Sequence, residues 1–312
     1  MLQASDLRGI VPPATTPLTE SDTVDREAIG RLMDWYLDAG ATAIFALGSS
    51  SEGPSLTREM RFEVVDACAD ALGGRVPLLA GVSSPSYLES VLQARRVAEI
   101  GADAIVATTP YYFHYGQEQL FEYFTALVAA SPLPLVIYDI PSRSDNALDV
   151  ETVLQLAENE RILGLKDSTG NIERGINIVN ALAGNDHFVM MQGSERLLGP
   201  ALLMGYEGAV MGFANACPRL CVAIHEAATA GDLRRTRELQ ELMNDAFPYF
   251  FAAEPGTANV GSIVGAMKTA QELQGLCRRR TLFPARQITD EDVRTIRAYL
   301  EPLAEAGWLE FA

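Results

Sequence analysis

Short apolar runs alternate with longer amphipathic segments along the first two thirds of the chain. The runs are apolar on both faces, as the strands of a buried parallel sheet are. They predict eight strands, at residues 10–14, 43–47, 78–82, 104–107, 135–138, 163–166, 188–191 and 209–211. Between them, apolar residues recur at helical spacing in segments that include 25–39, 58–72, 87–100, 117–130, 150–159 and 172–182. This alternation predicts an α/β fold.

The joints between predicted helices and strands repeat one design. Gly40, Gly101 and Gly205 each follow a predicted helix, where a left-handed backbone is needed, and a short link leads into the next strand. Eight such units favour a (β/α)8 barrel, the TIM barrel. A doubly wound open sheet is the competing fold, but no Gly-x-Gly-x-x-Gly follows the first strand to support it.

The strand pattern stops after about residue 219, and helical patterns continue over 232–251, 260–273 and 290–300. We expect Pro302 to end or kink the last helix. We also expect the loop at residues 254–257 to start the second half of this region. The predicted organisation is therefore a barrel over 1–218, followed over 219–312 by the last barrel helix and a C-terminal helical extension.

Composition narrows the functional classes. The chain has 312 residues, of which 48% are hydrophobic, and its formal net charge is −17. That charge argues against nucleic-acid partners and offers no basic patch to a membrane. We find no signal peptide and no apolar run of about 18 residues that could span a bilayer. Four cysteines without a Cys-x-x-Cys pair favour reduced thiols and a cytoplasmic location.

Lysine is scarce: the chain has two lysines against 22 arginines. Lys166 ends a predicted strand, where burial disfavours the ammonium form. Arginine cannot replace lysine where chemistry needs a neutral primary amine, because guanidinium stays protonated. Base composition of the genome is the alternative explanation. Lys268 is interpreted as an ordinary helix residue.

Polar groups gather where barrel enzymes place their chemistry, at the C-terminal ends of strands. A neutral Lys166 amine could form a Schiff base with a ketone, and Tyr138, which ends the neighbouring strand, could relay protons. A core tyrosine is the other interpretation of Tyr138. Residues 48–52, rich in hydroxyls, could bind a carboxylate or could simply open the following helix. Arg143 could clamp a second carboxylate or remain solvated.

The sequence has few of the residues and motifs that other kinds of catalysis require. The three histidines, at 114, 187 and 225, are too scattered to suggest the zinc site of a class II aldolase. There is no Gly-x-Ser-x-Gly elbow and no phosphate-binding Gly-Lys-Ser loop. Cys217 and Cys221 are interpreted as core thiols. We therefore expect no metal and no organic cofactor.

Four motifs together resemble one family. Gly-Ser-Ser-Ser-Glu at 48–52, Thr-Pro-Tyr-Tyr at 109–112, Tyr-Asp-Ile-Pro-Ser-Arg at 138–143 and Gly-Leu-Lys-Asp-Ser-Thr-Gly at 164–170 are similar to motifs of the dihydrodipicolinate synthase / N-acetylneuraminate lyase family, in the same order. The similarity runs from about residue 7 to residue 306. It implies a (β/α)8 barrel with C-terminal helices, commonly a homotetramer, that works as a class I pyruvate-dependent aldolase.

The resemblance also assigns roles to residues. It implies a pyruvate imine on Lys166, a proton relay through Tyr138, and Tyr112 completing that relay from a neighbouring subunit. The remaining roles concern substrate binding. Ser49 and Ser50 would bind the pyruvate carboxylate, Arg143 the carboxylate of the aldehyde substrate, Gly193 would lie in a substrate loop, and Met211 would lie near the pyruvate.

Departures from the family pattern leave the substrate open. Ser51 stands where the family usually has glycine, Ser144-Asp145 replaces Thr-Gly, and the Asn-Pro-Ile-Pro run expected after Glu254-Pro255 is replaced at 256–259. The turn at 81–85 is closer to the sugar-acid branch. The protein is thus expected to be a lyase, similar either to 4-hydroxy-tetrahydrodipicolinate synthase or to aldolases and dehydratases of 2-keto-3-deoxy sugar acids. The alternative is a non-catalytic barrel that serves as a ligand sensor or assembly subunit.

Overall fold

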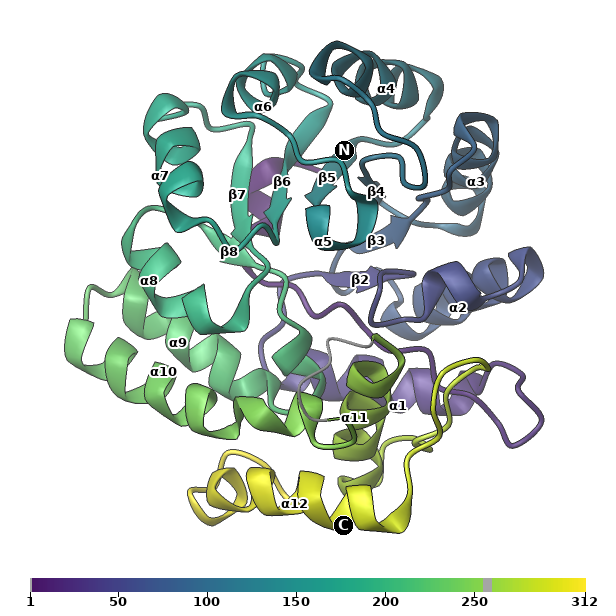
Figure 1. The fold of residues 1–312 in the computed structure, drawn as a ribbon, viewed down its shortest axis with the longest axis vertical. Helices are drawn as coiled ribbons and strands as arrows, with labels where there is room; N and C mark the ends of the chain where they lie inside the picture. Colours follow the sequence, from purple (N-terminus) through teal and green to yellow (C-terminus); the bar gives the residue numbers. More distant parts are fainter. Residues whose placement is uncertain (1, 255–259) are drawn as a thin grey trace.

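The computed structural model describes residues 2–254 and 260–312. Eight parallel strands form one sheet in the order β1-β8-β7-β6-β5-β4-β3-β2, and a parallel bridge between Pro13 and Phe45 joins its two edges (Figure 1). The predicted (β/α)8 barrel is therefore confirmed. The strands are β1 Gly9–Ile10, β2 Ile44–Ala46, β3 Leu78–Gly81, β4 Ala104–Thr108, β5 Leu135–Asp139, β6 Ile162–Asp167, β7 Val189–Gln192 and β8 Gly208–Ala209.

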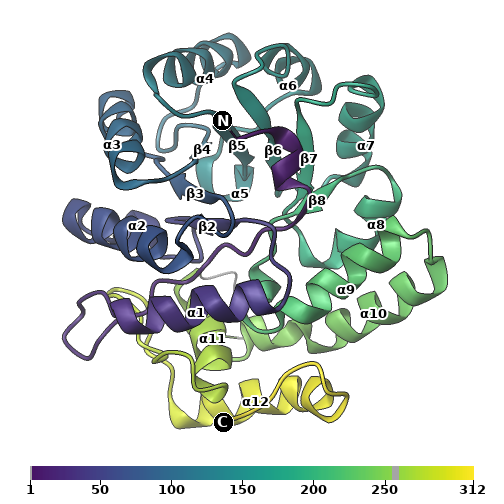
Figure 2. The ribbon, with the colours of Figure 1, turned by 180° about the vertical axis from the view of Figure 1, so that it is seen from behind.

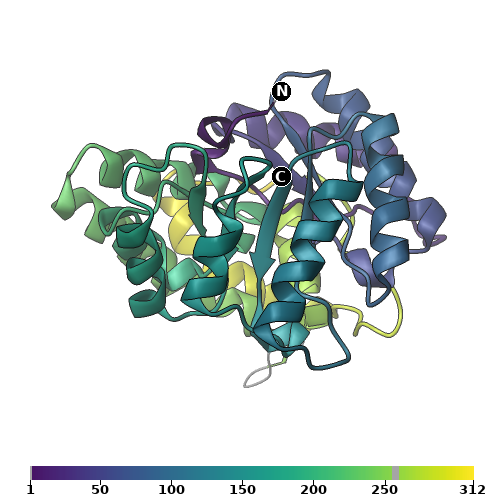
Figure 3. The same ribbon diagram turned by 90° about the horizontal axis from the view of Figure 1, so that it is seen from above.

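Helices surround the strands, as Figure 3 shows from above. Side-chain caps begin several of them: the Thr57 side chain accepts a hydrogen bond from Met60 N, and the Asn171 side chain accepts one from Arg174 N. Gly40, Gly101 and Gly205 have φ of +92°, +122° and +99°, so the predicted glycine joints are confirmed. The helices of this part are α1 Arg26–Asp38, α2 Arg58–Leu72, α3 Tyr87–Ile100, α4 Gln117–Ala130, α5 Pro141–Ser144, α6 Val150–Leu156, α7 Ile172–Ala181, α8 Leu198–Leu203 and α9 Pro218–Thr229.

Three further helices, α10 Leu233–Ala246, α11 Val260–Leu273 and α12 Asp290–Glu305, pack beside α1 and α9 (Figure 2). They share an apolar core with the barrel, in which Ile296 and Leu300 of α12 belong to the same cluster as Ile10 of β1. The predicted extension is thus helical. The expected loop at 254–257 lies outside the described residues beyond Glu254.

Of the two effects expected of Pro302, that it ends the last helix is wrong, and that it kinks the helix stays a prediction. Helix α12 continues through Pro302 to Glu305, and Ala306 N donates a hydrogen bond to Pro302 O at 3.1 Å. Pro302 is exposed and lies in the last turn of the helix, where it removes a single backbone donor. In the described part of the chain, no helix has the length and apolar character needed to cross a bilayer.

Candidate active site

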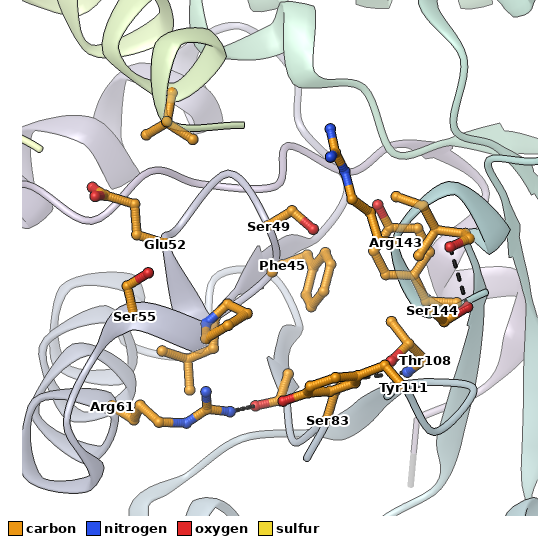
Figure 4. A pocket seen from close by; sticks show the side chains of 18 of the residues that line it. Phe45, Ser49, Glu52, Ser55, Arg61, Ser83, Thr108, Tyr111, Arg143 and Ser144 are labelled. Carbon is orange, nitrogen blue, oxygen red and sulfur yellow. Dashed lines mark hydrogen bonds between the residues drawn. The ribbon is translucent and has the colours of Figure 1, made fainter. Parts of the chain in front are cut away.

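A cavity of about 520 Å³ opens at the C-terminal ends of the strands. Helix α11 and the segment before α12 also wall it, through Val264, Pro284 and Ala285. Figure 4 shows Phe45 and Ser49 between Glu52 on one side and Arg143 on the other. Its polar lining comes from Ser49, Glu52, Ser55, Arg61, Ser83, Thr108, Tyr111, Tyr138, Arg143 and Ser144.

Lys166 and Tyr138 are paired across neighbouring strands. They are register partners between β5 and β6, and their side chains are 5% and 6% exposed. The Lys166 Nζ lies 3.8 Å from the centroid of the Tyr138 ring and 5.3 Å from that of Phe45. Among the described residues, the amine has no hydrogen bond and no ion pair. The buried Lys166 amine therefore lies near two aromatic rings and is held by no hydrogen bond or ion pair among the described residues.

The turn after β2 is held by its own side chains. Ser51 Oγ accepts a hydrogen bond from Leu47 N at 3.0 Å and donates to Ala14 O. Ser49 lines the cavity, whereas Ser50 is buried and is not among the lining residues described. The suggestion that this turn opens the next helix is wrong, because Thr57 caps α2 and a short 3-10 turn, Gly53–Ser55, intervenes.

Lys268 and Glu52 form a buried ion pair beneath this turn. The fully buried Lys268 Nζ donates to Glu52 Oε1 at 2.5 Å and to Arg280 O at 2.7 Å. The second oxygen, Glu52 Oε2, accepts from Leu282 N at 2.7 Å. Burial lowers the pKa of Lys268, and the Glu52 carboxylate opposes that shift. The interpretation of Lys268 as an ordinary helix residue is therefore wrong, and the scarcity of lysine was the signal for it too.

Arg143 is among the residues that line the cavity, whereas Tyr112 is not. Arg143, on the short helix α5, is exposed and lines the cavity. Tyr112 is 85% exposed, has φ +86° and packs edge to face on Phe113 with ring centroids 5.0 Å apart. Its neighbour Tyr111 lines the cavity instead. A single copy of the chain therefore does not bring Tyr112 to Lys166.

Gly193 lies where β7 approaches β6. Its N–H donates to Asp167 O at 2.8 Å, and a Cβ at this position would lie 2.0 Å from Ser168 Oγ. Glycine is thus needed for this close approach. Met211, which precedes a 3-10 turn after β8, is completely buried.

Glu195 is a candidate that the sequence analysis missed. Burial raises the pKa of its carboxyl, while the charge of Lys166 and the backbone N–H groups of Gly212 and Phe213 oppose that shift. A Cβ on Gly212 would lie 2.9 Å from Glu195 Oε1. The signal in the sequence was the Gln-Gly-Ser-Glu segment at 192–195, from which only Gly193 was chosen.

The site contains hydroxyls, an amine, guanidinium groups and carboxylates. Within residues 2–254 and 260–312, no group of three or more His, Cys, Asp or Glu side chains is arranged to hold a metal ion. The four cysteines are free and buried. The groups present can bind a small acid and attack its carbonyl carbon.

Comparisons with known proteins agree with this geometry. The model of the dihydrodipicolinate synthetase family matches residues 6–303. The chain is 34% identical over 284 residues to the 4-hydroxy-tetrahydrodipicolinate synthase of Cereibacter sphaeroides, covering 91% of this chain and 94% of that relative. The dihydrodipicolinate synthase structure from Bacteroides thetaiotaomicron superposes with a TM-score of 0.90 at 32% identity, covering 97% of this chain and 100% of that one.

A second solved structure is a prophage protein of the dihydrodipicolinic acid synthase family from E. coli K12, in complex with pyruvate. It matches with a TM-score of 0.88 at 25% identity, covering 95% of this chain and 98% of that one. The family match spans nearly the whole chain, and the barrel, the strand-end lysine and the tyrosine beside it are consistent with it. The protein is a lyase that belongs to the dihydrodipicolinate synthetase family.

Proposed function

We propose that this lyase binds pyruvate, or a 2-oxo acid that yields pyruvate, as an imine on Lys166, and that it then adds or releases an aldehyde. One observation carries the proposal: the buried Lys166 amine, which has no bonded partner among the described residues, lies 3.8 Å from the ring centroid of Tyr138, and Tyr138 lines the cavity. The pyruvate complex of the E. coli relative supports the choice of ligand.

The chemistry follows from a primary amine beside a phenol. The Lys166 nitrogen adds to the keto carbon, and Tyr138 relays the protons that turn the carbinolamine oxygen into departing water. The resulting iminium draws electrons from the adjacent carbon, which loses a proton to give an enamine. That carbon then bonds to the aldehyde carbon, and water hydrolyses the imine to free Lys166. In the reverse direction the same steps release the aldehyde.

The proposed substrate contacts lie around this centre. Ser49, Ser50 and the backbone of their turn would bind the carboxylate of pyruvate, and Arg143 would bind a carboxylate on the aldehyde. Gly193 would leave room at the end of β7, and Met211 would close the apolar side. Two classes of aldehyde remain candidates: aspartate semialdehyde, as in the synthase, which carries a carboxylate, and the aldehydes released from 2-keto-3-deoxy sugar acids.

We also propose that the working unit is a homotetramer in which Tyr112 enters the cavity of a neighbouring subunit. Tyr112 is 85% exposed, although its backbone has a positive φ that costs energy for a residue with a side chain. A large exposed aromatic side chain in a strained conformation suits a role across an interface. Sedimentation analysis tests the assembly, and Tyr112→Phe should slow turnover without dissociating the subunits.

Reductive trapping tests the imine directly. Incubation with pyruvate and borohydride should add one pyruvate-derived group, and peptide mapping should place it on Lys166. Lys268 is the internal control, because the chain has two lysines and this one is fully buried in its pair with Glu52. An unmodified chain, under conditions that trap the C. sphaeroides enzyme, would contradict the proposal and would favour a barrel that senses ligands without turnover.

Arg143→Ala distinguishes binding of the aldehyde from binding of pyruvate. We expect it to raise KM for an acidic aldehyde by about tenfold or more, because a charge-assisted contact is lost, and to leave pyruvate trapping on Lys166 unchanged. Steady-state assays over a panel of aldehydes check both values. If KM for every acidic aldehyde is unchanged, Arg143 has no role in aldehyde binding.

A further inference from the structure

A second pair of residues directly follows the proposed catalytic pair. Tyr138 and Lys166 are register partners, and the next partners along β5 and β6 are Asp139 and Asp167. Successive side chains of a strand point to opposite faces of the sheet. Tyr138 faces the cavity, so the two carboxylates lie on the outer face of the barrel, toward the helices. Both are buried, with exposures of 0% and 2%.

Arg174, in the first turn of α7, bridges these carboxylates. Its Nη2 donates to Asp139 Oδ2 at 2.6 Å, and its Nη1 lies 3.6 Å from Asp167 Oδ1. The same guanidinium donates from Nε and Nη2 to Leu148 O at 3.0 and 2.7 Å. The hydroxyl of Tyr206 donates to Asp167 Oδ2 at 2.8 Å. We call Asp139, Asp167, Arg174 and Tyr206 the outer clamp.

The backbone extends the clamp along the strand ends. Ser168 N donates to Asp139 O at 2.9 Å, and Gly193 N donates to Asp167 O at 2.8 Å. These bonds tie together the ends of β5, β6 and β7, immediately beyond Tyr138 and Lys166. A shift of the clamp therefore moves the backbone that carries the amine and the phenol.

Burying the charged groups of the outer clamp costs desolvation free energy, so the clamp is poorly suited to stabilising the fold. Two buried carboxylates share one guanidinium, and neither Asp139 Oδ1 nor Arg174 Nη1 makes a hydrogen bond within the described part of the chain. Buried ion pairs often stabilise no better than apolar residues of the same volume. What such a network does supply is a fixed geometry. A misplacement of about 1 Å in an active site can cost about 100-fold in rate.

We propose that the outer clamp is a set of positioning residues that fixes the Lys166 amine against the Tyr138 ring in the geometry needed for imine formation. The inference rests on the proposed function, since it assigns the clamp to the same two groups. Its members contact neither substrate nor reacting atoms. They act through the backbone of β5 and β6.

The charge of the clamp depends on pH. Burial raises the pKa of Asp139 to about 6, and the Asp167 carboxylate adds to the shift, while Arg174 and the Leu148 N–H oppose it. The charged and titratable groups around Asp139 are thus Arg174 from α7 and Asp167 from β6, with Tyr206 bonded to the latter. Below about pH 6, Asp139 is neutral and Arg174 loses one of its two anionic partners. Imine formation should therefore weaken in acid.

Three variants test the clamp, and a fourth serves as their control. Tyr206→Phe removes one hydroxyl, Asp139→Asn one charge and Arg174→Met the bridge. Arg161→Met is the matched control, because Arg161 donates to Val128 O, Ser131 O and Leu133 O near the opposite ends of the same strands. We expect the clamp variants to slow single-turnover trapping of pyruvate by about tenfold, with KM for pyruvate changed by less than about threefold. The control should change the rate by less than about twofold.

Two further readouts separate positioning from stability. In a Tyr138→Phe background the loss caused by Tyr206→Phe should shrink, because the clamp acts through the residue already removed. The fall in rate below about pH 6 should be steeper in the natural chain than in Asp139→Asn. If Arg174→Met does not fold, Tyr206→Phe and Asp139→Asn decide the matter.

Several results would overturn the inference. The clamp variants could trap pyruvate as fast as Arg161→Met, their losses could add in full to that of Tyr138→Phe, or the acid limb of Asp139→Asn could be as steep as that of the natural chain. In each case the natural chain still forms its adduct, so the proposed function stands and the clamp alone fails. If the natural chain forms no adduct on Lys166, the proposed function fails, and the positioning role fails with it.

Discussion

The Asp139 carboxyl has a pKa well above the ordinary value of an aspartate. Burial raises its pKa from 3.8 to about 6 in the folded chain. Between these values the folded state holds a proton that the unfolded state has released. The contribution of Asp139 to stability therefore falls as the pH rises from about 4 to about 6, and it is fully unfavourable at neutral pH.

Asp139→Asn should remove this dependence. We expect the free energy of unfolding of the variant, relative to the natural chain, to rise by about 1 kcal/mol or more between pH 5.2 and pH 7.5. Urea titrations at the two pH values measure the difference. If the free energy of unfolding of the variant differs from that of the natural chain by the same amount at both pH values, Asp139 does not titrate in this range.

Gly193 and Gly30 offer a matched pair of glycines. A Cβ on Gly193 would lie 2.0 Å from Ser168 Oγ and 3.0 Å from Asp167 O, whereas a Cβ on Gly30, in α1, meets nothing within 4 Å. Gly193→Ala should destabilise the protein by about 1–3 kcal/mol and slow pyruvate trapping. Gly30→Ala should stabilise it by about 0.5–1 kcal/mol. Thermal unfolding of both variants checks the contrast, and equal effects would contradict it.

Strand-end position was enough to bring Lys166, Tyr138, Ser49 and Arg143 into consideration, and the structure places Ser49, Tyr138 and Arg143 on one cavity. Strand-end position could not reveal the ion pair between Glu52 and Lys268. These residues are 216 positions apart in the sequence and meet only because α11 packs beneath the turn after β2. Nor could it separate Tyr111 from Tyr112, because the positive φ that turns Tyr112 outward depends on the folded loop. The roles of these residues remain predictions.

Periodicity located the elements well and their ends less well. The segments 58–72, 87–100, 117–130 and 260–273 are helices with the predicted bounds. The first strand is shorter than predicted, because Pro12 and Pro13 lack the N–H groups that a ladder needs. Helix α12 runs past Pro302 because a proline in the last turn removes a single N–H, and the carbonyls of Pro302, Leu303 and Ala304 still accept backbone hydrogen bonds.

Pro302→Ala should stabilise α12. The side chain is exposed, so little packing is lost, and alanine restores an N–H and removes the clash of the ring with the preceding turn. We expect a gain of about 1 kcal/mol in the free energy of unfolding, since proline's smaller unfolded-state entropy offsets part of the benefit. Urea unfolding tests it. A loss of stability would mean that Pro302 fits the helix end without strain.

The C-terminal helices and the barrel behave as one packed body in the described residues. The cluster that contains Leu300 of α12 also contains Ile10 and Ala209 of the sheet, and Lys268 of α11 reaches the turn after β2. The division of the chain at residue 218 into a barrel and a C-terminal part stays a prediction. The shared core favours a single cooperative transition over two.

Breaking the Lys268–Glu52 pair should be costly from either side. We expect Lys268→Met and Glu52→Gln each to lower the free energy of unfolding by about 3–5 kcal/mol, because each leaves a buried partner without compensation. The double variant should lose clearly less than the sum of the two single variants. Urea unfolding of the four proteins gives the coupling energy. Additive losses would mean that the two groups stabilise the fold independently.

Both lysines are buried, at 5% and 0% exposure, so the folded chain presents its side-chain cations to solvent as arginines and histidines. Reagents that acylate lysine ε-amines should find almost no target on the native molecule and two targets once it unfolds. Native labelling followed by mass spectrometry would then record opening of the structure itself: modification of Lys268 would mark separation of α11 from the barrel, and modification of Lys166 would mark access to the cavity.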